Sequence, residues 1–199
     1  VYVWFGPLSG SLDTTESGRM RLSAQLEPRN VDVGDLVRAF GRRQVVAGRF
    51  NGQTELRSEG DNIAELIRHL NTRTRFTMRP ARLQGFDLSK VASSGGAKGG
   101  QTVLDELTGT LETQNPDDGI RLRYAGLQAR SGVLSATGSA TVLNRRLNGE
   151  LAIDLVDGVV GLPLKLAGTL DDPQLSMTGG ALAGAAVGTA VLPGVGTAI

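Results

Sequence analysis

The chain has 199 residues, a formal net charge of +1 and 40% hydrophobic residues, a balance typical of a soluble protein with one large or two small domains. It contains no cysteine, which excludes disulfide bonds, thiolate nucleophiles and cysteine-ligated zinc sites. Aromatic residues make up only 4%, and the 28 glycines favour short strands and turns over a helical bundle. The chain begins at Val1 with neither an initiator methionine nor a signal-like segment, so we expect it to be part of a longer polypeptide.

The first 40 residues predict a β-hairpin followed by a short helix. Strand-like sequence covers residues 1–5, and residues 20–26 alternate apolar and polar side chains with the period of two that is typical of strands. Residues 30–41 instead space their apolar side chains at helical intervals and end at Gly41, a usual residue just past a helix.

A strand, a second helix and another extended segment follow. Residues 46–56 alternate again, and residues 61–70 predict a capped amphipathic helix with an acidic residue in its first turn and basic residues near its end. Residues 73–86 return to extended chain. Pro80 cannot donate a backbone hydrogen bond, so we expect it at a sheet edge or a bulge.

Residues 38–82 form a locally basic segment with ten arginines against four acidic residues. Arginine favours bidentate contacts with phosphate and carboxylate groups, so the segment indicates either an anionic partner or simply a solvated strand face. Lipid head groups fit better than nucleic acid, because only Phe40, Phe50 and Phe76 could stack on bases and no known motif spacing is present. We predict no nucleic-acid partner.

Residues 93–101 predict a mobile glycine-rich loop that cannot bury apolar area. A lysine among glycines resembles a phosphate-binding loop, but such a loop needs Gly-Lys followed by Ser or Thr at a helix start, and Lys98 precedes Gly99. A flexible connection remains the better interpretation.

Residues 107–170 predict a meander of four or five antiparallel strands, which Asp171-Asp172-Pro173 ends. The five-residue pattern Leu-x-Gly-x-Leu occurs four times, at residues 8–12, 107–111, 147–151 and 166–170. Glycine inside a strand gives up side-chain packing, so it marks either close packing of two sheets or a curved sheet with an apolar concave face.

Together these segments predict a mainly β (α+β) fold: a curved antiparallel β-sheet or meander that forms a groove, with two or three short helices and a Gly/Ala-rich C-terminal tail. We expect one β-rich domain over residues 1–172 and a separate tail over residues 173–199. The tail carries no charge from Pro173 onward, and Gly180, Gly184 and Gly188 would form one smooth stripe on a helix. That stripe suits membrane contact or self-association, but a disordered or loosely docked terminus is an equal alternative.

The residues that carry enzyme chemistry are scarce. His69 is the single histidine, and no serine elbow or phosphate loop is present. The paired carboxylates at 117/118 and 171/172 lie beside Pro or Gly, where Asp is expected for its own backbone hydrogen bonds. We therefore predict a protein that is not an enzyme and has no cofactor and no metal site.

Several segments resemble the C-terminal region of the AsmA family, and the resemblance covers nearly the whole chain from about Leu8. It rests on Asn30-Val31-Asp32-Val33-Gly34-Asp35-Leu36-Val37-Arg38-Ala39-Phe40, the helix between Gly60 and Leu70, Gly85-Phe86-Asp87-Leu88, the glycine loop, and Gly168-Thr169-Leu170-Asp171-Asp172-Pro173 before the tail. The resemblance implies a Gram-negative envelope protein in the periplasm, anchored to the inner membrane through a segment outside this chain. It also implies a likeness to TamB and to bridge-like lipid transfer proteins, whose curved sheets hold acyl chains.

The residues and the resemblance together predict a β-groove module that shields phospholipid acyl chains for lipid transport and outer-membrane homeostasis, without turnover chemistry. A sealed core is the alternative for the apolar face. The candidate groove residues are Leu134, Ala136, Leu151, Ile153, Leu155, Leu162, Leu164 and Leu166. The competing hypothesis is an assembly factor for outer-membrane proteins that binds partner strands along an exposed sheet edge. A glycan hydrolase is a distant third, because it would need two carboxylates converging across a cleft.

Overall fold

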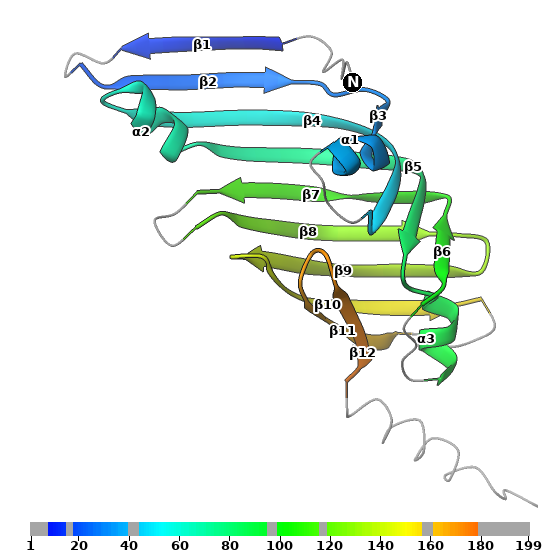
Figure 1. Cartoon of the computed structure of the whole chain (residues 1–199). Coiled ribbons are helices and arrows are strands. Elements are labelled where there is room, and N and C mark those ends of the chain that lie inside the picture. Colours follow the sequence, from blue (N-terminus) through cyan, green and yellow to red (C-terminus); the bar gives the residue numbers. More distant parts are fainter. Residues whose placement is uncertain are drawn as a thin grey trace, which may run out of the picture.

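Ten strands follow one another side by side in a single curved antiparallel sheet (Figure 1). The computed structural model describes residues 8–14, 18–39, 44–94, 99–115, 119–156 and 161–178. Within these residues the sheet holds twelve strands in all, and three short helices accompany it. The predicted fold class, a curved antiparallel sheet with two or three short helices, is confirmed.

The first half of the chain contains β1 (Leu8–Thr14), β2 (Met20–Leu26), β3 (Val31–Asp32), α1 (Val33–Ala39), β4 (Val46–Gly60), α2 (Ile63–Arg68), β5 (Asn71–Gln84) and α3 (Leu88–Ser94). The second half contains β6 (Gln101–Leu104), β7 (Glu106–Gln114), β8 (Arg121–Arg130), β9 (Leu134–Leu143), β10 (Arg146–Leu155), β11 (Leu162–Gly168) and β12 (Pro173–Met177). The strand order is β1-β2-β4-β5-β7-β8-β9-β10-β11-β12, while the short strands β3 and β6 pair with β4 and β5.

The registers place the apolar set of every strand on one face of the sheet, because cross-strand partners share a face. This inner face carries Leu12 opposite Leu22, Phe50 opposite Met78, and Ile153 opposite both Ala136 and Leu162. The other, outer face carries the charged and polar set, for example Arg73 opposite Glu112. Among the described residues, none of the strand positions on the inner face is charged.

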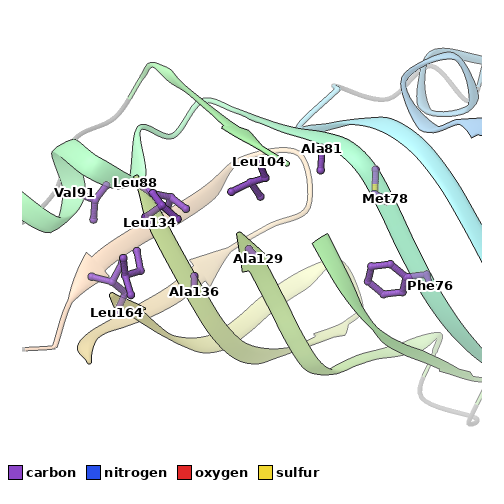
Figure 2. Packing of buried hydrophobic residues seen from close by; sticks show 11 residues of the cluster. Phe76, Met78, Ala81, Leu88, Val91, Leu104, Ala129, Leu134, Ala136 and Leu164 are labelled. Carbon is purple, nitrogen blue, oxygen red and sulfur yellow. The ribbon is translucent and has the colours of Figure 1, made fainter. Parts of the chain in front are cut away.

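The main hydrophobic core lies on the inner face toward the end of the sheet where α3 packs (Figure 2). Its buried members come from β5, α3, β6, β8, β9, β10 and β11: Phe76, Met78, Ala81, Leu88, Val91, Leu104, Ala129, Leu134, Ala136, Ile153 and Leu164. A smaller cluster of Ala140, Val142 and Leu147 lies on the same face of β9 and β10. The inner face is therefore unevenly covered.

Two glycines on the inner face, Gly109 within the Leu-x-Gly-x-Leu pattern and Gly138 outside it, make room for large side chains of neighbouring strands. A Cβ built on Gly138 would lie 2.6 Å from Cδ2 of Leu151, its cross-strand partner, and one built on Gly109 would lie 2.8 Å from Cδ2 of Leu127 and 3.1 Å from Cζ of Phe76. The described residues form one sheet, so close packing between two sheets does not explain these glycines. They let leucine and phenylalanine fold over the strand beside them.

Both predicted helices are confirmed as α1 and α2. Of the two positions expected for Pro80, a sheet edge or a bulge, the structure shows a bulge. The pairing of β4 with β5 shifts between Gly48 and Phe50, opposite the Arg79–Pro80 step, so the proline's missing N–H interrupts no regular ladder. The helix α3 was not expected. It begins after Asp87, whose carboxylate accepts a hydrogen bond from the backbone N–H of Lys90 at 3.1 Å.

Two boundaries differ from the sequence-based expectation. The predicted glycine-rich loop over residues 93–101 is shorter, because α3 extends to Ser94 and β6 begins at Gln101; residues 95–98 lie outside the described part of the chain. The meander also does not end at Pro173, since β12 pairs with β11 from there to Met177. A proline is tolerated as the first residue of an edge strand, and Leu175 and Met177 continue the inner face.

Candidate functional site

Half of the predicted groove residues are buried in the protein's own core. Leu134, Ala136, Ile153 and Leu164 are exposed by only 2%, 7%, 0% and 1%. The other four are partly buried: Leu151, Leu155 and Leu162 pack against the main core, and Leu166 packs against the smaller cluster. The eight residues do share the inner face, as predicted, but this end of the face is a closed core, the alternative that the sequence left open.

Side chains from other parts of the chain cover this end. Leu88 and Val91 of α3 and Leu104 of β6 are exposed by 3%, 0% and 0%, and they belong to the same core cluster as Ile153 and Leu164 (Figure 2). A hydrocarbon guest would have to displace these side chains. The available apolar surface must therefore be sought elsewhere on the inner face.

An open leucine patch lies at the opposite end of the sheet, on β1, β2 and β4. We define it as Leu12, Leu22, Leu26 and Leu56. Leu12 is 60% exposed, the other three are partly buried, and none of the four belongs to either hydrophobic core cluster. The strand registers bring these leucines together. Leu12 lies opposite Leu22. Leu56 lies opposite Ala24, the β2 residue midway between Leu22 and Leu26.

The helices α2 and α1 lie toward the two ends of β4, the strand that carries Leu56 (Figure 1). At one end α2 packs on β4, and the Ser58 hydroxyl donates a 2.5 Å hydrogen bond to the carbonyl of Leu66, whose side chain is buried. At the other end α1 packs on β4 beside Phe50, and Val33 contacts the main core. Positions 50 and 58 of a strand are about 27 Å apart at 3.4 Å per residue, whereas a helix is about 10 Å wide. Neither helix is therefore wide enough to cover the whole stretch of β4 between these positions.

Side-chain hydrogen bonds hold the start of α2 in place. The Glu65 backbone N–H donates to Oδ1 of Asn62 at 3.0 Å, and the Asp61 backbone N–H donates to Oε2 of Glu65 at 2.8 Å, which together resemble a capping box. The bond from Asp61 lowers the pKa of Glu65 below its ordinary value of 4.5. A lowered carboxyl pKa stabilises the folded state above pH 4.5 and loses this effect as the pH falls through the lowered value.

Replacing Asn62 with Ala should lower the free energy of unfolding by about 0.5–2 kcal/mol, because the Glu65 N–H loses its acceptor. Asn62→Asp is the matched control, since Asp caps a helix as well as Asn does, and it should leave the unfolding midpoint nearly unchanged. Urea denaturation followed by circular dichroism measures both. Equal loss in the two variants would argue against the cap.

The rest of the inner face, outside the leucine patch, is also an environment of low polarity. Burial raises the pKa of Tyr124, on β8, above its ordinary value of 10.0. A raised tyrosine pKa stabilises the folded state fully below pH 10 and loses this effect as the pH rises through the raised value. Most of the other polar groups on this face are hydroxyl groups. For example, the Oγ1 atoms of Thr54 on β4 and Thr74 on β5 lie 2.9 Å apart. A neutral, hydrocarbon-rich guest suits such a surface, and a charged one does not.

The basic middle of the chain lies mainly on the outer face. Arg73 and Arg123 both approach Glu112, at 3.7 and 3.3 Å, Arg79 contacts Glu106, and Arg21 bonds Glu59 at 2.8 Å. The arginines of these pairs are exposed and their acidic partners are exposed or partly buried, so each pair contributes little to stability. These pairs support the solvated-strand interpretation of this segment.

Two surface hollows have volumes of about 390 and 420 Å³, and no residue of the leucine patch lines either of them. Polar residues and glycine are the majority of the residues that line each hollow. The first is lined by Glu27, Pro28, Arg29, Asn51, Gly52, Gln53, Arg75, Phe76 and Thr77. The second is lined by Gln44, Gln84, Gly85, Gly100 and Gln101. Neither offers the continuous apolar lining that a hydrocarbon chain needs.

The residues considered for chemistry remain apart. His69 is exposed, and its Nδ1 lies 2.9 Å from the carbonyl oxygen of Glu59. Asp171 pairs with Arg145 at 2.5 Å, and the backbone N–H of Asp172 donates to the Thr169 hydroxyl in a turn. Asp117 and Asp118 lie outside the described residues. Within the described ranges, no group of three or more His, Cys, Asp or Glu side chains could hold a metal ion.

The predicted tail stripe of Gly180, Gly184 and Gly188 lies outside the described residues. Of the helices that the structure does describe, none has the length and apolar character needed to cross a bilayer.

The leucine patch was not singled out from the sequence, although the signal for its face was present. Residues 20–26 and 46–56 alternate as clearly as residues 147–155 do. Alternation identifies the apolar face of a strand, but it does not tell which part of that face a distant helix covers.

In comparisons with known proteins, no family model matches this chain, and neither a curated protein nor a solved structure gives a significant match.

Proposed function

We propose that this chain is a lipid-handling β-sheet module that shields a phospholipid acyl chain on the leucine patch, without turnover chemistry. The observation that carries the proposal is a leucine surface left outside both core clusters, on a sheet face where none of the described strand positions is charged. The resemblance to the AsmA family supplies the biological setting: the periplasm of a Gram-negative envelope, reached through an inner-membrane anchor outside this chain, and a role in lipid transport and outer-membrane homeostasis.

The chemistry of the patch favours hydrocarbon over head group. Each CH₂ removed from water contributes about 0.8 kcal/mol, so about ten methylenes over the patch contribute roughly the 8 kcal/mol of a micromolar Kd, before the cost of ordering the chain. A phosphate placed on the inner face would lose its hydration and meet no cationic strand residue there. The acyl chain would therefore lie between α1 and α2 while the head group stays in water.

Mass spectrometry of an organic extract of the purified chain tests the proposal. The wild-type chain should retain phospholipid. Leu26→Glu should retain at least tenfold less per mole of protein, because placing a carboxylate against the acyl chain costs more than about 1.4 kcal/mol. Gln25→Glu is the matched control: it adds the same carboxylate at the adjacent exposed position on the outer face of β2 and should retain lipid as the wild type does.

Two outcomes would contradict the proposal. One is an extract of the wild-type chain without phospholipid after purification from cells and after incubation with vesicles. The other is equal lipid retention by Leu26→Glu and Gln25→Glu, which would mean that the lipid is bound elsewhere.

The open edge of β1 favours a second candidate function, that of an assembly factor that binds partner strands. Photoreactive residues discriminate the two. Lipid adducts at Leu26 favour lipid handling, whereas protein adducts at Ser11, on the edge strand, favour assembly.

A further inference from the structure

The edge strand β1 lacks the features that prevent edge-to-edge pairing. It is seven residues long, Leu-Ser-Gly-Ser-Leu-Asp-Thr, and it pairs with β2 from Leu8 to Thr14 without a register shift. It contains no proline, no lysine and no bulge, which are usual means by which proteins protect a free edge, and its one charged residue, Asp13, lies on the outer face. In the described part of the chain no strand pairs with its other side.

The opposite edge of the sheet differs in each of these respects. The strand β12 has five residues, begins at Pro173, which has no backbone N–H, and lies close to α3. A short strand with a proline and a helix beside it is a poor template for another strand. The two edges are therefore unequal, and β1 is the one available for pairing.

The sequence of β1 complements itself in an antiparallel pair centred on Ser11. A twofold axis at Ser11 places Leu12 of one copy opposite Gly10 of the other and Ser9 opposite Asp13. Leucine opposite glycine is the combination that the sheet already uses where Leu151 folds over Gly138. Asp13 then meets a serine, whereas a parallel pair in register would oppose two aspartates. Because opposed residues share a face, the two inner faces lie on the same side.

We propose that β1 pairs with β1 of a second copy of this chain to form a twofold dimer with one continuous sheet. The pairing leaves Leu12, which is 60% exposed in one chain, covered by the partner's strand. The contact between two seven-residue strands falls below the roughly 1,200 Å² of a standard stable interface, so the dimer is weak and concentration-dependent. The inference does not depend on lipid binding.

A single cysteine tests the geometry, because the chain has none of its own. In the proposed dimer the two Ser11 residues face each other directly, with Cα atoms about 4.5–5.5 Å apart, which is within disulfide range. Ser11→Cys should therefore form a disulfide-linked dimer on mild oxidation at high protein concentration. Ser23→Cys, which faces the same side one strand further in, should stay monomeric, and so should Ser176→Cys on β12.

A second variant tests the same edge without crosslinking. Leu12→Lys places a charge on the inner side of the edge and should shift the chain to monomer in light scattering, with its circular dichroism unchanged. Ser23→Lys is the control and should dimerise like the wild type. A monomeric wild-type chain at high concentration, or a Ser11→Cys protein that forms no disulfide, would overturn the proposal. Crosslinking of Ser176→Cys instead would overturn it too, by assigning the contact to the other edge.

Discussion

Replacing Ile153 with Asp should prevent this chain from folding, and replacing it with Ala should lower the free energy of unfolding by about 2–5 kcal/mol. Ile153 is fully buried among the side chains of the main core, between Ala136 and Leu162 on the neighbouring strands. Truncation leaves a cavity there, and a carboxylate would lose its hydration without gaining a partner. Urea denaturation of Ile153→Ala and the circular dichroism of Ile153→Asp measure the two effects.

Asn148→Asp is the control for this experiment. Position 148 is exposed on the outer face of the same strand, so the change should alter stability by less than about 0.5 kcal/mol. If Ile153→Asp instead folded normally and lost only bound lipid, this end of the inner face would be an open groove, contrary to the burial described above.

The second large effect is expected at Gly138, where Ala should destabilise the fold by about 1–3 kcal/mol and Val by more. A Cβ at this position would lie 2.3 Å from the carbonyl oxygen of Glu150 and 3.0 Å from Cα of Leu151. Both are backbone atoms of β10, so the pairing of β9 with β10 must shift to admit the methyl group. Thermal unfolding of the two variants measures the cost.

Gly132→Ala provides the matched comparison. A Cβ at Gly132 would meet no atom within 4 Å, and its backbone angles need no glycine, so the midpoint should change little. In a double-mutant cycle with Leu151→Ala, which is itself destabilising because Leu151 packs on the core, the loss caused by Gly138→Ala should be only partly reduced, because the nearest clash is with the Glu150 carbonyl rather than with the leucine side chain. A Gly138→Ala loss that vanished in the Leu151→Ala background would assign the strain to Leu151.

The period of two in the sequence predicted the sheet and the face to which each strand contributes. Leu26 and Ile153 have the same alternating surroundings, yet one lies outside the core clusters and the other is fully buried. The difference arises because α3, from residues 88–94, covers strands that lie 40 to 70 residues later in the chain. Local periodicity carries no information about such contacts, so it could not separate open surface from core.

The helix α3 was missed because its local signal is weak. Leu88 and Val91 supply a single helical interval before the glycine-rich segment, and a helix of seven residues is unstable alone. Its burial against the sheet stabilises it, and that contact is tertiary. The helix α2 was predicted because its Asn62 cap and its spacing of apolar residues are both local.

Because the core is concentrated at one end of the sheet, the two ends of the sheet should open at different free energies. The strands β5 to β11 share one large cluster, whereas β1 and β2 join the rest through ladder hydrogen bonds and a few leucines. Opening β1 and β2 exposes little buried hydrocarbon, so the free energy for detaching this corner is well below that for global unfolding. We therefore expect the N-terminal strands to exchange between attached and detached forms while the α3 end persists.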